Sequence, residues 1–283
     1  MADTQNVVYA QAYGQNIMQL AQQKYSKLVN TVYMRPNVRG KTFFQDQIDT
    51  WSMEVKGSRN TQTPNNDPNL ARRMGVMVDY HDNRMLDRGD ELKTISDPRS
   101  AYTIAAAQSL GRQIDNVIIR AALGTAASGE TGTTSITNGN IILATAASMT
   151  LARIVAVKAQ FDAQDVEMED RYFVITPAAL DNLLNTTAAT SSDFNSVKAL
   201  VRGEINTWMG FNWIMSTQLA AVSASTLIGV AYQKNGICLG MASAPLVRTD
   251  ERADLSYSWQ LYYELNIGAV RLEEDRVVIL NEG

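Results

Sequence analysis

The longest regular pattern of apolar and polar residues in this chain predicts a helix over residues 97–124. Asp97 can cap the first turn, Pro98 suits the first helical position, where no N–H is needed, and Gly124 offers a stop. At about 1.5 Å per residue this helix would be roughly 40 Å long. One face repeats apolar or small residues every three or four positions: Ile104, Ala107, Leu110, Gly111, Ile114, Val117, Ile118 and Ala121. The opposite face is polar and is predicted to point outward: Gln108, Arg112, Asp115 and Asn116.

Residues 1–35 form a polar arm that carries a second helical pattern, which Pro36 would end. The residues that mark one face of this second helix are Ile17, Leu20, Ala21, Lys24, Leu28 and Val32.

From Lys41 onward the apolar period changes from that of a helix to the two-residue period of strands. The alternating residues, which predict the two legs of one long β-hairpin, are Trp51, Met53 and Val55, then Val76, Val78 and Tyr80. The tip between the legs, residues 57–73, is rich in Asn, Pro and Thr and has Leu70 as its one large apolar residue. Because such a ribbon is marginal alone in water, we expect it to lie on another surface, such as a neighbouring subunit.

The middle of the chain predicts a mixed module over residues 147–242. Small polar residues make 127–140 a loop, and another polar break spans 186–196. The predicted elements are a helix at 151–161, a strand at 171–175, a helix that starts at Thr176 and Pro177, a region at 197–205 that leads through a turn into a strand at 211–214, and strands at 227–232 and 236–239. Its core is expected to contain Phe173, Ile175, Phe211 and Trp213.

The clearest strand pattern lies near the C-terminus, where apolar residues alternate without a break: Tyr257, Trp259, Leu261, Tyr263, Leu265 and Ile267. Gly268 permits a bend or bulge, and residues 277–280 offer a final strand. We expect these strands to pack against the long helix as a second layer.

Composition places the chain among globular proteins, because 45% of its 283 residues are hydrophobic and 19% are charged. No apolar run approaches the roughly 20 residues of a membrane span, and the start lacks the pattern of a secretion signal, so a cytosolic, non-membrane protein is expected. A net charge of −4 gives no reason to expect a dedicated nucleic-acid binder. The single cysteine, Cys238, excludes an internal disulfide.

Candidate catalytic chemistry is sparse. His81, the single histidine, shares a predicted strand face with Asp79 and precedes further carboxylates, but the spacing matches no metal motif and favours a solvated acidic turn. Cys238 sits in an apolar strand, where a thiol usually behaves as a small buried hydrophobe. The chain has no GxSxG, Walker or GxGxxG motif, so we predict neither enzyme activity nor a cofactor or metal.

The order of these elements is more informative than any single motif. An arm, a long hairpin, a long helix, a mixed module and a return by alternating strands resemble the major capsid proteins of tailed bacteriophages, a fold shared with encapsulins. The segments that carry the resemblance are DPRSAYTIAAAQSLGRQIDNVIIRAALG, RYFVITPAALDNLLN, ALVRGEINTWMGFNWIMS, LIGVAYQKNGICLGM and YYELNIGAVRLEEDRVVIL.

The resemblance implies an α+β capsid fold with four parts. They are an N-terminal arm at 1–35, an extended loop at 36–95, a peripheral domain at 96–146 and 243–283 built on the spine helix 97–124, and an axial domain at 147–242. The spine helix would pack through Ile104, Leu110, Ile114, Val117 and Ile118. The extended loop would contact other subunits through Trp51, Met53, Val55, Leu70, Val76 and Val78.

The implied function is that of a major capsid protein. Hexamers and pentamers of the chain would build an icosahedral shell, assembled in the bacterial cytoplasm, that encloses double-stranded DNA without binding it specifically. Portal, scaffolding and decoration proteins would be further partners. Two alternatives stay open: an encapsulin-like nanocompartment shell, and a cytosolic metal-dependent enzyme that uses His81 and nearby carboxylates.

Overall fold

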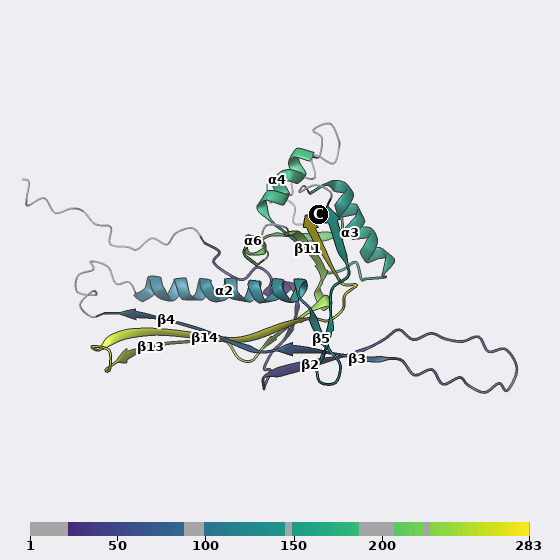
Figure 1. Ribbon diagram of the computed structural model, residues 1–283, viewed down its shortest axis with the longest axis horizontal. Helices are drawn as coiled ribbons and strands as arrows, with labels where there is room; N and C mark the ends of the chain where they lie inside the picture. The colour runs from purple at the N-terminus through teal and green to yellow at the C-terminus, as the bar shows by residue number, and fades with distance from the viewer. Residues whose placement is uncertain (1–21, 88–98, 145–148, 187–206, 223–226, 283) are drawn as a thin grey trace, which may run out of the picture.

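A computed structural model of the chain describes residues 22–87, 99–144, 149–186, 207–222 and 227–282. An elongated layer, formed by one long helix and long strands, carries a compact sheet-and-helix unit above it (Figure 1). The described strands form three sheets of five, six and four strands. None of the described helices is long and apolar enough to cross a membrane.

The long helix α2 (Arg99–Leu123) confirms the predicted helix, although Asp97 and Pro98 lie outside the described residues. Gly124 follows its last residue and donates its backbone N–H to the carbonyl of Arg120 at 2.8 Å, which completes the final turn. The predicted packing residues Leu110, Ile114, Val117 and Ile118 are buried in one cluster with residues of the strands beneath the helix. Ile104 does not follow them, because 52% of its surface is exposed.

Two of the four residues of the predicted polar face of α2, Gln108 and Asp115, are buried and do not point outward, whereas Arg112 and Asn116 are half-buried. The chain around Leu28 lies over this side of the helix at Asp115 and hydrogen-bonds to its carboxylate. The helix is therefore covered on two sides, whereas an amphipathic pattern reports only which positions are apolar.

The segment that covers α2 is not the predicted second helix. In the described residues from Gln22 onward, the chain forms the short 3-10 helix η2 (Val29–Thr31) and the strand β1 (Tyr33–Arg35). Leu28 and Val32 are buried, but they are separated by one 3-10 turn and not by an α-helical one. Ile17, Leu20 and Ala21 lie outside the described residues, as does the predicted region at 197–205.

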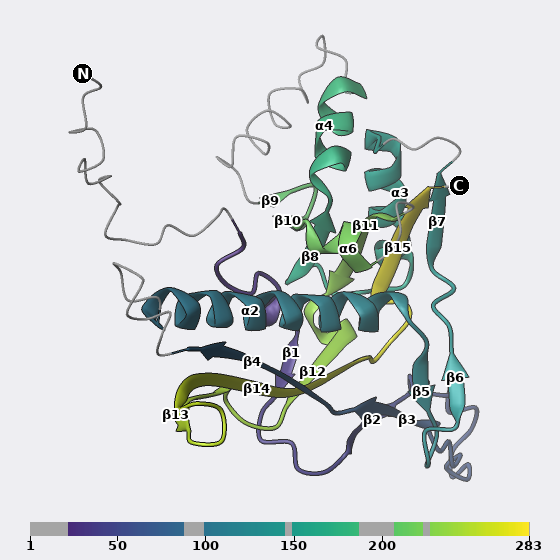
Figure 2. The ribbon, with the colours of Figure 1, turned by 60° about the vertical axis from the view of Figure 1, so that its left-hand side comes forward.

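The five-stranded sheet lies against α2. It contains β1, β12 (Ile237–Met241), β14 (Ser258–Arg271) and β13 (Leu246–Arg252) in that order, and β4 (Val78–Leu86) pairs with the other edge of β14. β4 and β14 run alongside the helix (Figure 2). Leu239, Leu265 and Ile267 share a core cluster with α2, which confirms that the C-terminal alternating strand packs on the long helix.

Two details of β14 differ from the prediction. Tyr257 lies before the strand, in a turn with a φ of 55°, and is exposed. Gly268 forms no bulge but stays in register opposite Gly240. A side chain at 268 would overlap the carbonyl oxygen of Val76, so the glycine is needed for the close approach of the chain that crosses β14.

The hairpin consists of β2 (Thr42–Ile48) and β3 (Leu70–Val76), paired from Thr42 opposite Val76 to Ile48 opposite Leu70. The predicted legs are therefore wrong: residues 51–55 form no strand, and Val78 and Tyr80 belong to β4 in the other sheet. The tip runs from 49 to 69. Alternation marks extended chain but does not specify which strand pairs with it.

The predicted loop 127–140 contributes to the same sheet. The strands β5 (Ala126–Ser128) and β6 (Thr134–Ile136) extend it in the order β2-β3-β5-β6. Three-residue strands are too short for a periodic signal, so composition alone indicated a loop.

The six-stranded sheet forms the core of the upper unit. Its order is β7 (Ile141–Ala144), β15 (Val277–Glu282), β11 (Leu227–Gln233), β8 (Arg171–Ile175), β10 (Phe211–Met215) and β9 (Thr207–Trp208). The helices α3 (Leu151–Ala163) and α4 (Pro177–Thr186) cover one face, and α2 with the short α6 (Gln218–Val222) lies against the other. Phe173, Ile175 and Phe211 are buried against α3 and α4, and Trp213 stacks on Phe173 with ring centres 4.4 Å apart.

The sheets do not follow the boundaries expected from the sequence. β12, expected in the mixed module, joins the sheet under α2, whereas β15, expected with the C-terminal strands, joins the six-stranded sheet. The chain thus crosses between the two units in both directions.

A buried arginine stabilises the junction where the three sheets and α2 meet. Arg271, with no exposed surface, donates from Nη1 to the carbonyls of Ala122 and Gly124 at 3.1 and 2.6 Å, and from Nη2 to the carbonyl of Ile136 at 2.9 Å. Its Nε lies 3.4 Å from Glu274. Burial lowers the pKa of the Arg271 guanidinium, and the Glu274 carboxylate opposes this shift. The cation thus satisfies the carbonyls left free at the end of α2.

The variant Arg271→Met should lower the free energy of unfolding by about 3–5 kcal/mol, because it removes a buried cation, leaves three carbonyls without their donor and leaves Glu274 with Arg73 as its ion-pair partner. Urea unfolding of the purified subunit measures this loss. Arg252→Met is the matched control, since Arg252 pairs with Asp254 on the surface, and should change stability little. Equal small losses in both variants would contradict the role of Arg271.

Candidate assembly interface

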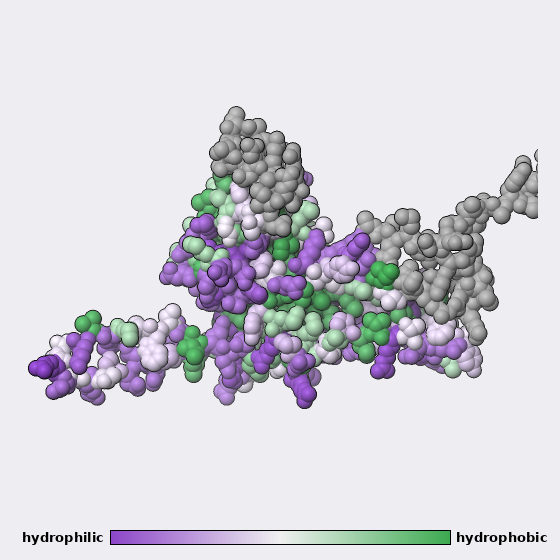
Figure 3. Space-filling view, turned by 180° about the vertical axis from the view of Figure 1, so that it is seen from behind, coloured by the Kyte–Doolittle hydropathy of each residue, from purple (hydrophilic) through white to green (hydrophobic). Residues whose placement is uncertain are grey.

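In the described part of the chain, the two most exposed large apolar side chains, Met53 and Val55, lie on the exposed loop, residues 49–69. Trp51, Met53 and Val55 have 72%, 99% and 96% of their surfaces exposed. The loop projects away from the rest of the molecule in both views (Figures 1 and 3). Side chains of this kind are normally removed from water, so the loop has the composition of a contact surface.

Hydrogen bonds inside the exposed loop do not organise it into a sheet. The backbone N–H of Asp49 donates to the carbonyl of Asn69 at 3.0 Å, which continues the β2–β3 pairing by one step. Farther out, Asn66 donates to Glu54 at 3.3 Å, and the hydroxyls of Ser58 and Thr61 lie 2.7 Å apart. The backbone of the loop thus leaves donors and acceptors available along its length.

The base of the loop, by contrast, is firmly attached. Arg73 is buried, donates from Nε to the carbonyl of Leu272 at 2.8 Å, and pairs with Glu274 at 2.6 Å. Arg72 pairs with Asp46 at 2.6 Å across the hairpin, and this hydrogen bond lowers the pKa of the Asp46 carboxyl. A firmly attached base and exposed apolar side chains at residues 51–55 suit a loop that contacts a second molecule.

The other predicted contact residues do not join this patch. Leu70 is exposed at the end of β3, opposite Ile48. Val76 and Val78 are partly exposed at the other end of β3, where the chain crosses into the sheet under α2. The loop residues and the crossover residues are therefore separate surfaces.

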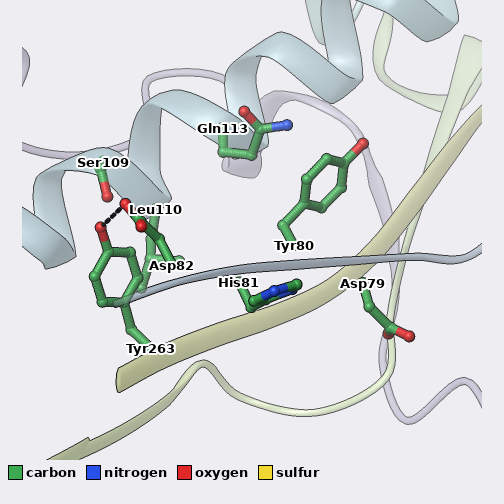
Figure 4. A pocket seen from close by; sticks show the side chains of 8 residues that line it. All are labelled: Asp79, Tyr80, His81, Asp82, Ser109, Leu110, Gln113 and Tyr263. Carbon is green, nitrogen blue, oxygen red and sulfur yellow. Dashed lines mark hydrogen bonds between the residues drawn. The ribbon is translucent and has the colours of Figure 1, made fainter. Parts of the chain in front are cut away.

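A groove between α2 and β4 contains His81 and some of the carboxylates that the sequence offered as candidate catalytic or metal-binding residues (Figure 4). It has a volume of about 340 Å³ and is lined by Asp79, Tyr80, His81, Asp82, Ser109, Leu110, Gln113 and Tyr263. The Tyr263 hydroxyl donates to Asp82 at 2.7 Å and thereby lowers the pKa of that carboxyl. Tyr80 and Asp82 point toward the helix, whereas Asp79 points away from it (Figure 4).

This groove does not form a metal centre. Among the residues that the structure describes, no three His, Cys, Asp or Glu side chains are placed to hold a metal ion. His81 lies opposite Glu264 on β14 and beside Tyr262, with ring centres 6.4 Å apart.

Cys238 and His81 do not meet either. They lie in the same sheet, but Cys238 pairs with Val270 and His81 with Glu264, positions roughly 20 Å apart along β14 at about 3.3 Å per residue. Burial raises the pKa of the Cys238 thiol to about 11, which keeps it protonated near neutral pH. The thiol is a core side chain and not a nucleophile.

Sequence reasoning missed the charged residues that position these surfaces: Arg73, Asp115, Arg271 and Glu274. Only the fold brings each of them to its partners. The one sequence feature that could have pointed to Asp115 is its position on α2, one helical turn after Gly111.

An elongated subunit that exposes apolar side chains on a projecting loop, and has no catalytic cluster among its described residues, belongs to the class of proteins that associate into assemblies. More specifically, the chain belongs to the phage capsid protein family, whose model matches residues 6–282. No curated protein sequence matches it.

Solved capsid structures share this fold. The capsid protein of cyanophage P-SCSP1u is 18% identical with a TM-score of 0.76, over 98% of this chain and 94% of that one. That of cyanophage Pam1 is 13% identical with a TM-score of 0.75, over 100% and 99%. That of Ralstonia phage GP4 is 11% identical with a TM-score of 0.73, over 99% and 97%.

These findings confirm the resemblance drawn from the order of elements and the α+β capsid fold that it implies. The chain is a major capsid protein, a structural component of a phage shell. They favour neither an encapsulin nor a metal-dependent enzyme.

Replacing Trp51, Met53 and Val55 together by serine should lower the yield of assembled particles by about tenfold or more, because truncating a central apolar contact weakens an interface by about 2 kcal/mol. The thermal unfolding of the unassembled subunit should not change, since these side chains are exposed in it. Sedimentation and calorimetry measure the two effects. Met168→Ser, at an exposed methionine on the turn after α3, is the control; equal yields in both variants would contradict the prediction.

Proposed function

We propose that hexamers and pentamers of this capsid protein form the icosahedral head of a tailed phage, and that the exposed loop of each copy docks on its neighbour. The exposure of Trp51, Met53 and Val55, on a loop whose base is fixed by the buried Arg73 and its ion pair with Glu274, carries this proposal. Apolar surface that the chain itself leaves in water is stabilised by burial against a second copy, at about 25 cal/mol per Å².

We assign the extended loop, the peripheral domain and the axial domain by the sheets of the structure and not by the boundaries predicted from the sequence. The extended loop is the β2–β3 hairpin with its tip, residues 42–76. The peripheral domain is α2 with the five-stranded sheet, and the axial domain is the six-stranded sheet with α3 and α4. Axial domains of neighbouring copies would meet around the centre of each hexamer or pentamer.

The shell is proposed to enclose double-stranded DNA without gripping it. A net charge of −4 disfavours dense phosphate contacts, which would hinder the entry and release of the genome. Portal, scaffolding and decoration proteins are proposed as further partners, with assembly in the cytoplasm of the bacterial host. Strength comes from repetition, because each weak contact recurs in every symmetric copy.

Excising residues 50–68 and joining Asp49 to Asn69 through Asn-Gly should give a folded subunit that forms no shells. Asp49 and Asn69 already face each other across the ladder, so a two-residue turn closes the shortened hairpin without strain. Circular dichroism checks the fold, and electron microscopy counts the shells. The full-length chain, prepared in parallel, is the control for assembly conditions. Shells formed by the shortened chain at the full-length yield would refute loop docking.

A further inference from the structure

Asp115, in the middle of α2, is a carboxylate with no exposed surface. A buried charge is costly unless hydrogen bonds or an opposite charge compensate it. Oδ1 accepts the Ser26 hydroxyl at 2.6 Å and the backbone N–H of Leu28 at 3.1 Å. Oδ2 accepts the backbone N–H of Lys27 at 3.1 Å and the side-chain amide of Gln23. All four donors belong to one short stretch, the arm segment (residues 22–28).

This arrangement is not an ion pair. The Lys27 ammonium, the nearest cation in the arm segment by sequence, donates instead to the carbonyl of Met215 at 2.8 Å. The charge of Asp115 is compensated by neutral donors. Two of these donors are the backbone N–H groups of Lys27 and Leu28, which come just before η2. They point at the carboxylate in the way that N–H groups at the start of a helix point at a bound anion. Removing the arm segment would therefore take away the four described donors that compensate Asp115.

Gly111 completes the site one helical turn away. A Cβ there would lie 2.8 Å from the backbone nitrogen of Ser26 and 3.1 Å from the carbonyl carbon of Tyr25. Positions 111 and 115 share one face of the helix, so both residues contact the same stretch of arm backbone. Gly111 leaves the space that this backbone fills, and Asp115 beside it accepts the hydrogen bonds.

The other end of the segment is attached to the core. Leu28 is buried, and the Thr31 hydroxyl donates to its carbonyl at 2.7 Å. The Tyr232 hydroxyl, 2.6 Å away, donates to Thr31 in turn. At the outer end the side-chain oxygen of Gln22 accepts from Arg112 on α2 at 2.8 Å. The arm segment is therefore held at both of its ends, to α2 at Gln22 and to the core at Leu28.

We propose that Gly111 and Asp115 form a seat that places the N-terminal arm of this chain on α2, and that assembly requires the arm to be seated. Asp115 is a positioning residue that selects a donor-rich segment. The second half of the proposal rests on the proposed shell function, because it assumes that a misplaced arm blocks contacts between copies. The first half concerns the single subunit.

Limited trypsin digestion of the unassembled chain tests the seat. Cleavage after Lys24 and Lys27 reports release of the arm segment, and cleavage after Lys56 and Arg59 on the exposed loop is an internal reference for protease activity. Asp115→Asn keeps the size of the side chain but turns one acceptor into a donor that faces other donors. It should raise the ratio of arm to loop cleavage by about tenfold, through local opening. Mass spectrometry measures the ratio.

Asp165→Asn is the matched control, since Asp165 is an exposed carboxyl whose φ of 51° asparagine tolerates, and it should leave the ratio unchanged. A double variant, Gln23→Ala with Ser26→Ala, removes donors without altering α2 and serves if Asp115→Asn does not fold. It should raise arm cleavage about threefold or more. An unchanged ratio in the folded variants would overturn the seat.

Particle formation by the same variants tests the second half. Variants with raised arm cleavage and unchanged thermal unfolding should assemble poorly, whereas Asp165→Asn should assemble as the unaltered chain does. Normal particles from a variant with a released arm would overturn the requirement for seating. Failure of the unaltered chain to form shells would count against the proposed function instead, and the digestion result would still stand.

Discussion

The carboxylate of Glu274, shared by the buried arginines Arg73 and Arg271, holds the separate parts of this protein together. Arg73 comes from the base of the hairpin, and Arg271 reaches the carbonyls at the end of α2 and in β6. Neither cation can leave its partners without an uncompensated charge in the interior. The hairpin, the long helix and the turn into the six-stranded sheet are therefore fixed relative to one another, which gives the exposed loop a fixed base from which it projects.

A second constraint is the uneven distribution of apolar surface. The clusters under α2 and around α3 are closed, whereas Trp51, Met53 and Val55 are left in water. A chain that only had to fold would gain from burying them, so their exposure makes sense for a subunit whose remaining contacts lie in other copies. The seat at Asp115 differs from both, because it holds the arm segment by hydrogen bonds to one carboxylate.

Elements that depend on local periodicity could be predicted from the sequence, whereas those that depend on contacts far along the chain could not. The helix from Arg99 to Leu123 and the strand from Ser258 to Arg271 have long, uninterrupted periods, and both were predicted. The hairpin was misplaced because its legs alternate no more strongly than β4 does, and the choice of partner depends on contacts far along the chain. In the described part of the arm, from Gln22 onward, the predicted helix does not form for a similar reason, since Asp115 takes backbone N–H groups that a helix would have used.

The sequence by itself determined the α+β class, the long helix, the C-terminal strand, the lack of catalytic motifs and the order of elements that resembles a phage capsid protein. These follow from local periodicity and residue type, which each stretch of chain carries on its own. Only the tertiary structure decided which sheet receives β12 and β15, which side of α2 is covered, and which charged residues are buried. Burial of Arg73, Asp115 and Arg271 requires donors and acceptors from distant segments, and no local pattern records where those segments will lie.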